Sequence, residues 1–208
     1  MFIVLEGIDG AGKGRQRNEL TAHLSRKFEG ITSLDFPNHD NILYKHLIHP
    51  VLHGEIKLAP KAWFLSFVLD QLMSQEQILE AKGSSKIHVI ADGYYTTAIV
   101  YQCILEKVFS LEDALRIAKV FEITPPDLAV YIDVDPEVAL ERKLAEEGHD
   151  EGMDMYEGKI IKQKTIRSGF QQLVHEQIFC PWEQVDGSAT VEAVLADIIN
   201  KLEQHKLF

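Results

Sequence analysis

Short apolar runs alternate with longer segments in which apolar residues recur every three or four positions. Continuous apolar runs that end at Gly, Pro or Asp are typical of buried parallel strands, and the longer spacing is typical of amphipathic helices. Strands alternating with helices favour an α/β fold, with helices on both faces of a parallel sheet. The pattern predicts five strands, at residues 2–6, 31–36, 86–92, 127–134 and 182–187.

Helices are expected to fill most of the chain between these strands. Proline near a first helical turn is tolerated, whereas proline inside a helix breaks it. The pattern shows no internal repeat and no linker, so we expect one domain over residues 1–208. The predicted helices span 13–28, 41–82 with breaks at Pro50 and Pro60, two segments that meet near Ser110, a segment from Pro136, 156–175, and 190–205.

Charge and cysteine content narrow the classes of ligand and compartment. The formal net charge is −11, so we expect no polymeric nucleic acid and no anionic membrane as partner, while a small phosphorylated ligand remains compatible. Cys103 and Cys180 have neither metal-binding spacing nor a disulfide framework. No signal peptide or membrane-spanning run is visible, and we therefore expect a reducing, cytoplasmic location.

The segment "GIDGAGKGRQ" at residues 7–16 carries the clearest chemical signal. It follows a predicted strand and opens a predicted helix, the context in which a glycine-rich loop binds phosphate through backbone N–H groups and a helix N-terminus. Lys13 is placed to reach the terminal phosphates of a nucleoside triphosphate. The sequence therefore predicts a P-loop NTPase fold with an ATP site at Gly7, Gly10, Ala11, Gly12, Lys13, Gly14 and Arg15.

The loop lacks the hydroxyl that normally contacts a magnesium ion. The residue after Lys13 is Gly14, where Ser or Thr is usual. The loop resembles "GAGKGTQ" of adenylate kinases, but Arg15 stands where they have Thr. We therefore expect Mg²⁺ to rest on nucleotide oxygens, water and Asp92, and Arg15 to supply positive charge near the phosphates.

The chain as a whole resembles the thymidylate kinases over nearly its full length. The opening of that family usually reads "FEGIDGSGKSTQ", and residues 2–16 are similar to it. "DFPN" at 35–38 resembles its "FP" turn, and 89–102 resembles its "DRY" segment. The nearest likeness is "PPDLAVYIDVDPEVALER" at 125–142, and "MDMYE" at 153–157 resembles the lid motif. The resemblance implies a short lid at about 146–157.

This resemblance assigns roles to particular residues. Asp9 corresponds to the acid that binds the sugar hydroxyl of the acceptor, and Asp92 to the acid beside the metal. Lys13, Asp92 and Arg15 are the expected catalytic residues, and Arg142 joins the ATP site. Phe67 corresponds to an aromatic residue that stacks on the pyrimidine, although core packing explains its helical spacing equally well. The implied acceptor site consists of Asp9, Pro37, His39, Phe67, Gln71, Tyr94, Thr97, Tyr101 and Gln102.

Several arginines of the family pattern are replaced. Gly93, Gln71, His39 and Met155 occupy positions where the family commonly has arginine, and no arginine occurs between Arg26 and Arg116. Arginine binds phosphate bidentately, which glutamine and glycine cannot do. If His39 replaces a lost arginine, it acts only when protonated, and activity falls above its pKa. Lys45, His46 and His49 are further cations near the acceptor turn, although the two histidines are favoured as surface residues.

We interpret the chain as a kinase that transfers a phosphoryl group from Mg·ATP to a pyrimidine deoxynucleoside monophosphate, most directly dTMP to dTDP. Two alternatives stay open at the level of sequence. One is a related kinase for a modified deoxynucleotide or a nucleoside. The other is a catalytically weakened, nucleotide-binding relative. The resemblance also implies a homodimer.

Overall fold

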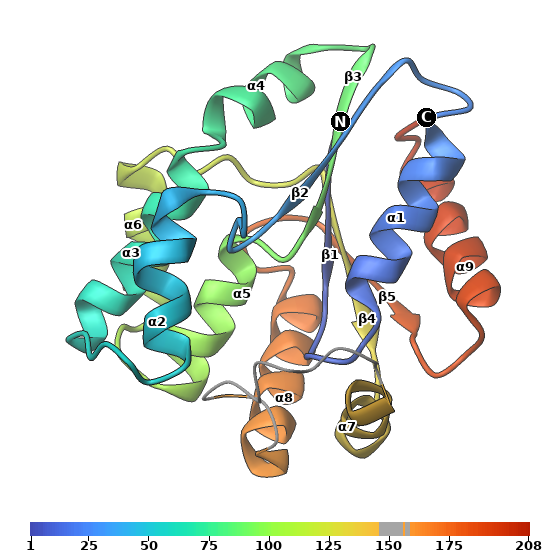
Figure 1. The fold of residues 1–208 in the computed structure, drawn as a ribbon. Coiled ribbons are helices and arrows are strands. Elements are labelled where there is room, and N and C mark those ends of the chain that lie inside the picture. The colour runs from blue at the N-terminus through green and yellow to red at the C-terminus, as the bar shows by residue number, and fades with distance from the viewer. Residues whose placement is uncertain (146–155, 157–158) are drawn as a thin grey trace.

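Five parallel strands form the centre of the molecule. The computed structural model describes residues 1–145, 156 and 159–208. Strand order across the sheet is β2-β3-β1-β4-β5, and all four strand pairs are parallel (Figure 1). The five strands predicted from the apolar runs are confirmed, with ends that shift by one residue at most. They are β1 (Phe2–Glu6), β2 (Gly30–Asp35), β3 (Ile87–Asp92), β4 (Leu128–Asp133) and β5 (Trp182–Asp186).

Helices cover both faces of this sheet. Helices α1 and α9 pack together on one face, and α3, α5 and α8 lie on the other (Figure 1). The central strand β1 is buried along its whole length, which explains its uninterrupted apolar sequence. The helices are α1 (Lys13–Leu24), α2 (His49–Leu52), α3 (Pro60–Leu72), α4 (Gln75–Gly83), α5 (Tyr95–Ile99), α6 (Leu111–Val120), α7 (Pro136–Ala145), α8 (Ile160–Glu176) and α9 (Val191–Gln204), with π-helical segments at Tyr44–Ile48 and Val100–Leu105.

Helix ends differ more from the sequence prediction than strand ends do. The helix predicted to reach Phe28 ends at Leu24, because a turn follows in which the N–H groups of Lys27 and Phe28 both bond to the Leu24 carbonyl. Phe28 still packs against the core from that turn, which is why it fits the helical spacing. The predicted lid lies outside the described residues except for Tyr156. No helix in the described ranges is long and apolar enough to cross a membrane.

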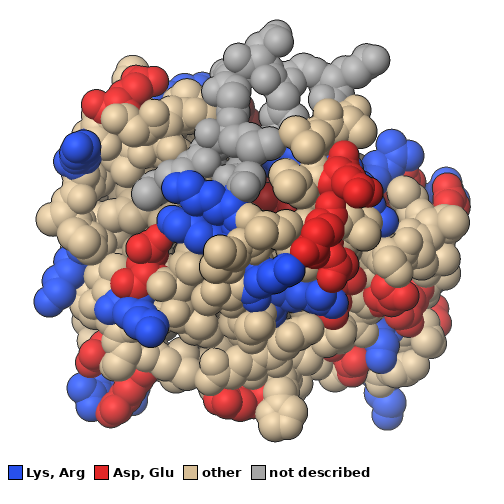
Figure 2. All heavy atoms as spheres, turned by 90° about the horizontal axis from the view of Figure 1, so that it is seen from below, with Lys and Arg blue, Asp and Glu red and all other residues tan. Residues whose placement is uncertain are grey.

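Parallel strands place their carboxyl ends at one edge of the sheet, and ligands of such folds bind there. Asp92 is aligned with Leu5 on one side and with Asp35 on the other. The ends of β1, β2 and β3 therefore meet, and each continues directly into a segment that carries predicted site residues. Figure 2 looks onto this lower edge of the molecule and shows basic and acidic side chains intermixed over its described part.

Candidate active site

The glycine-rich loop joins β1 to α1 and has the backbone of a phosphate cradle. The Ala11 N–H donates to the Ile8 carbonyl at 3.1 Å, and the Gln16 N–H donates to the Gly12 carbonyl at 3.0 Å. Gly10 has a φ of 81°, and a Cβ there would lie only 2.2 Å from the Ala139 carbonyl oxygen. Glycine is required because α7 packs directly on the loop. The predicted context of strand, loop and helix is therefore confirmed.

The Lys13 side chain folds back over its own loop. Its Nζ donates to the carbonyls of Gly7 at 3.0 Å and Ile8 at 3.2 Å, and it lies 3.9 Å from Asp9 Oδ1. These contacts hold the ammonium group against the start of the loop. A triphosphate in the cradle would meet this ammonium as its main counter-charge.

Asp92 stands where the missing hydroxyl would act. A Cβ on Gly14 would be 3.4 Å from Asp92 Oδ2, so the carboxylate lies next to the position of a Ser or Thr side chain. Burial raises the pKa of Asp92, and the nearby charges of Lys13 and Arg17 oppose that rise. No group of three or more His, Cys, Asp or Glu residues that could bind a metal occurs in the described residues. One carboxylate fits Mg²⁺, which protein sites commonly hold with waters and substrate phosphates.

Glu6 is a buried acid beside the loop that sequence reasoning missed. Its side chain is fully buried and accepts hydrogen bonds from the hydroxyls of Thr96 and Thr97, the second at 2.7 Å. Burial raises the pKa of Glu6 to about 7, although both hydroxyls and the charge of Lys13 favour the ionised form. Thr97, which is predicted to contact the acceptor, donates its hydroxyl to this carboxyl. The only sequence signal was an acid inside an apolar run.

Aromatic and amide side chains line the acceptor side of the loop. The Tyr101 hydroxyl donates to Asp9 Oδ2 at 3.2 Å. The Tyr156 ring packs edge-on against Tyr101 at 4.9 Å, and its hydroxyl accepts hydrogen bonds from Trp63 Nε1 at 3.2 Å and Gln102 Nε2 at 3.4 Å. The structure therefore brings Asp9, Tyr101 and Gln102 together as predicted. It adds Trp63, which no motif indicated, and Tyr156 from the predicted lid, which was not assigned to the acceptor site.

Two buried amides on this side have unpaired oxygens. Gln71 and Gln102 are each at most 2% exposed, and the Oε1 atom of each has no hydrogen-bond partner. A buried acceptor without a partner is costly, so such atoms are natural contacts for a ligand that brings a donor. Phe67 lies partly buried against Trp63, with ring centroids 4.4 Å apart. This contact is compatible with either of the roles considered for Phe67.

A tight turn after β2 forms the next wall. It contains the cis peptide bond Phe36–Pro37, and Asp70 on α3 bonds to the residues that follow it. Asp70 accepts hydrogen bonds from the Asn38 N–H at 3.0 Å and from Asn41 Nδ2 at 2.5 Å. Burial raises the pKa of Asp70, whose side chain is almost completely enclosed.

His39 occupies this turn but is a poor replacement for arginine. Its ring packs on Tyr44, with centroids 4.3 Å apart. Burial lowers the pKa of His39, although the carboxylates of Asp92, Asp70 and Asp40 oppose the shift. The neutral imidazole is therefore favoured near neutral pH. His39 therefore does not supply a permanent positive charge on this side.

Three predicted residues lie apart from this cluster. Arg15 is on the solvent side of α1, where its guanidinium is 66% exposed and pairs with Glu19 at 2.9 Å. Residues two apart on a helix do not share a face, so Arg15 points away from the side of Lys13. The Tyr94 ring is buried in the core, and its hydroxyl accepts a hydrogen bond from Gln75 Nε2 at 2.7 Å. Arg142 Nη1 donates to the Gly187 carbonyl at 2.9 Å, near the end of β5.

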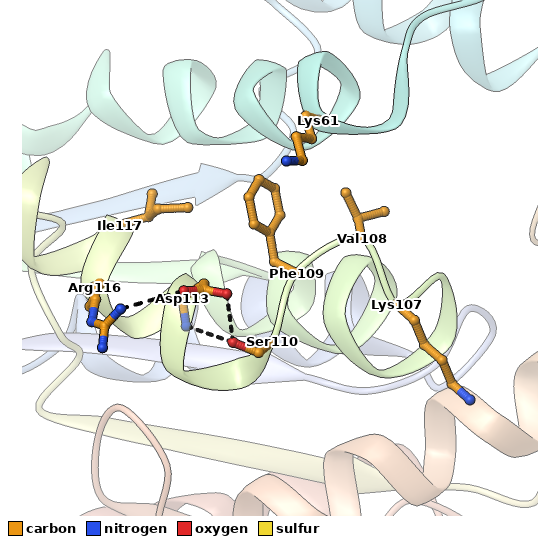
Figure 3. A pocket seen from close by; sticks show the side chains of 8 residues that line it. All are labelled: Lys61, Lys107, Val108, Phe109, Ser110, Asp113, Arg116 and Ile117. Atoms are coloured by element: carbon orange, nitrogen blue, oxygen red, sulfur yellow. Dashed lines mark hydrogen bonds and ion pairs between the residues drawn. The ribbon is translucent and has the colours of Figure 1, made fainter.

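A separate surface pocket opens between the start of α3 and the turn before α6 (Figure 3). The Phe109 ring points toward Lys61, whose Nζ lies 5.5 Å from the ring centroid. Arg116 is paired with Asp113 and Glu112 there. None of the predicted site residues lines this pocket, which is made of Lys61, Lys107, Val108, Phe109, Ser110, Asp113, Arg116 and Ile117.

A phosphate loop at the end of the central strand of a parallel α/β sheet defines the class of P-loop nucleotide-binding proteins. The family model described as thymidylate kinase matches residues 5–198. This chain belongs to the thymidylate kinase family.

Individual relatives extend over almost the whole chain. A thymidylate kinase of Thermosipho africanus is 26% identical and aligns with 99% of this chain and 98% of its own length. A probable thymidylate kinase of Methanococcus aeolicus is 31% identical, covering 99% and 97% respectively. A thymidylate kinase of Plasmodium falciparum is 26% identical over 99% of this chain and 91% of its own. The likeness therefore includes both the phosphate loop and the acceptor side.

Proposed function

We propose that this protein transfers the γ-phosphoryl group of ATP to dTMP, giving ADP and dTDP. The observation that carries the proposal is the juxtaposition of Lys13 on the phosphate loop with Asp9, Tyr101 and Gln102 on the acceptor side. Membership of the thymidylate kinase family supports dTMP as the acceptor. We take residues 1–208 as one kinase domain, with the lid at about 146–157.

In the reaction, an oxygen of the dTMP phosphate attacks the γ-phosphorus, and the bond between that phosphorus and the β,γ-bridging oxygen breaks. Negative charge develops on the transferred group and on the departing ADP. Lys13 would leave its carbonyl partners and donate to these oxygens, while the backbone N–H groups of the loop hold the donor phosphates. Asp9 would accept a hydrogen bond from the sugar of dTMP and Phe67 would stack on its base.

Asp92 is the residue that would hold Mg²⁺, either directly or through a bound water. The ion would neutralise charge on the donor phosphates and fix their orientation. The carboxylate next to Gly14 then takes the place of the usual loop hydroxyl. Arg142, near Gly187 at the end of β5, would contribute to the nucleoside end of the ATP site.

We further propose that two copies associate and that the protein acts in a reducing, cytoplasmic setting. Leu65 and Leu69 are exposed on α3, and Met73 is exposed directly after it. Val120 and Phe121 are exposed at the end of α6. Both helices lie on the same flank of the molecule (Figure 1). Burying such apolar side chains against a second copy would be favourable. Both cysteines are buried free thiols, as in many proteins of reducing compartments.

The test of the activity is ADP formation from Mg·ATP with dTMP, dUMP, other nucleoside monophosphates and thymidine as acceptors. We expect dTMP to be the preferred acceptor, and Lys13→Ala to lower kcat on the order of a hundredfold or more, as for loss of a central charge-stabilising donor. Arg116→Ala, on the surface of α6, is the matched control and should keep full activity. Turnover that persists in Lys13→Ala would point to a contaminating kinase. ATP binding without turnover of any acceptor would contradict the proposal.

A further inference from the structure

Arg17 reaches the acceptor side from the middle of the first helix. It lies four residues after Lys13 on α1, so the two side chains share one face of the helix. Its guanidinium is only 14% exposed and pairs with the Asp35 carboxylate. Nη1 also lies 3.5 Å from the Leu34 carbonyl oxygen, and Nη2 donates to Asn18 Oδ1 at 3.1 Å. These contacts hold the guanidinium at the end of β2.

This position borders the acceptor turn. Asp35 is aligned with Asp92 across β2 and β3, and Phe36 and Pro37 follow it directly. The Arg17 charge lowers the pKa of Asp92, as the charge of Lys13 does, so both cations act on the same carboxylate. Side chains of a helix lean toward its N-terminus, and the N-terminus of α1 is the phosphate-loop end. The Arg17 guanidinium therefore lies at the end of β2, beside the turn that leads into the acceptor side.

The acceptor side needs such a cation. Asp9, Asp35, Asp70 and Asp92 all lie around it, and a monophosphate would bring further negative charge. Gly93, directly after β3, has no side chain to offer, and the pKa of His39 is lowered by burial. Arg17 comes from α1, outside the arginine-free stretch between Arg26 and Arg116, and chain folding carries it to the same place.

We propose that Arg17 binds the phosphate group of the acceptor nucleotide, in place of the arginine that is replaced by Gly93. The proposal rests on the proposed function, because it assigns a residue to the same acceptor site. On binding, the guanidinium exchanges the Asp35 carboxylate, whose side chain is 46% exposed and can turn to solvent, for phosphate oxygens. Guanidinium binds phosphate bidentately, and this exchange gives the charge-assisted pair that neutral Gln71 and His39 do not supply.

The test compares binding of dTMP with binding of thymidine, since the two ligands differ only in the phosphate. Calorimetric titrations would use wild-type protein, Arg17→Met and Arg17→Lys. We expect Arg17→Met to weaken dTMP binding by about tenfold or more, the usual effect of losing a charged hydrogen bond, with thymidine and ATP binding changed less than about twofold. Arg17→Lys should recover part of the dTMP affinity, because it keeps the charge but not the bidentate geometry.

A purely structural role for Arg17, joining α1 to β2, predicts another result. In that case Arg17→Met would weaken the binding of dTMP and of thymidine equally, or it would lower the melting temperature without changing dTMP affinity. Either result overturns the proposal. Asp35→Asn separates the two roles. This substitution removes the carboxylate that competes with phosphate for Arg17. If Arg17 binds phosphate, dTMP should bind a few-fold more tightly; if the ion pair is only structural, dTMP affinity should not increase. Arg26 is an exposed arginine just after α1. Arg26→Met is therefore the matched control and should leave the affinity for both ligands unchanged.

These measurements distinguish this inference from the proposed activity because they need no turnover. Wild-type protein that binds dTMP but transfers no phosphate would overturn the proposed function and leave the Arg17 result readable. Wild-type protein that prefers thymidine to dTMP would overturn both. Normal phosphorylation of dTMP together with unchanged dTMP affinity in Arg17→Met would overturn the role of Arg17 alone.

Discussion

Glu6 shows how a single side chain beside the phosphate loop can make stability depend on pH. Its folded-state pKa of about 7 lies above the ordinary value of 4.5, because the carboxyl is fully buried. Between these values the folded protein binds more protons than the unfolded chain, so the free energy of unfolding decreases as pH rises. The destabilisation is absent below about pH 4.5 and complete above about pH 7.

Replacing Glu6 by Gln should remove this dependence. Gln keeps the size of the side chain. Its Oε1 can accept a hydrogen bond from one of the Thr96 and Thr97 hydroxyls, and its Nε2 can donate to the oxygen of the other. Relative to wild type, we expect Glu6→Gln to gain stability progressively from about pH 4.5 to about pH 7, by a few kcal/mol at about 1.4 kcal/mol per pKa unit, and no further above that. Urea unfolding across this range measures the difference. Parallel stability curves for the two proteins would show that Glu6 titrates normally.

Single residues also show how far sequence reasoning reaches. The positions of Lys13, Gly10 and Asp92 could be predicted because they depend on neighbours in one short motif or at one strand end. Glu6 could not, since its hydroxyl partners lie about ninety residues away along the chain. The hypothesis for Arg15 considered proximity along the sequence but not the direction of the side chain around α1. Arg17 was missed for the same reason.

At the scale of elements, α3 and the turn after β2 form one unit joined by Asp70. Asp70→Ala removes acceptors from the Asn38 N–H and Asn41 Nδ2 while leaving α3 in place. We expect the KM for dTMP to rise several-fold, the KM for ATP to stay within about twofold, and the free energy of unfolding to fall by about 1–3 kcal/mol. Steady-state kinetics and urea unfolding measure these effects.

The matched variant Asp70→Asn keeps one acceptor oxygen of nearly the same shape. Its effect on the KM for dTMP should therefore be clearly smaller than that of Asp70→Ala. If Asp70→Ala changed the KM for dTMP and the KM for ATP equally, the turn would have no particular part in acceptor binding. Such links between α3 and a distant turn leave no periodic trace in the sequence, whereas the strands do, because burial on both faces requires continuous apolar runs.

For the whole molecule, the exposed apolar side chains of α3 and α6 predict the state of assembly. Leu65→Glu combined with Leu69→Glu places two charges on the proposed contact, and the dimer should dissociate because buried unpaired charge is costly. Light scattering during gel filtration would show the mass halve from that of two chains to that of one. Ile161→Glu changes an exposed apolar residue on α8, outside the proposed contact, and should keep the wild-type mass. A wild-type mass of one chain would contradict the proposed association.

Lys13 and Arg17 lie one helical turn apart on α1, so the helix fixes the distance between them. Four residues of α-helix advance about 6 Å along the axis. If Lys13 binds the donor phosphates and Arg17 binds the acceptor phosphate, a single rigid helix sets the distance between the two groups. Phosphate-binding residues on separate loops would not fix that distance in the same way. A fixed distance of this kind selects acceptors by the length of their phosphate chain, and an acceptor that carried an additional phosphate would be too long for it.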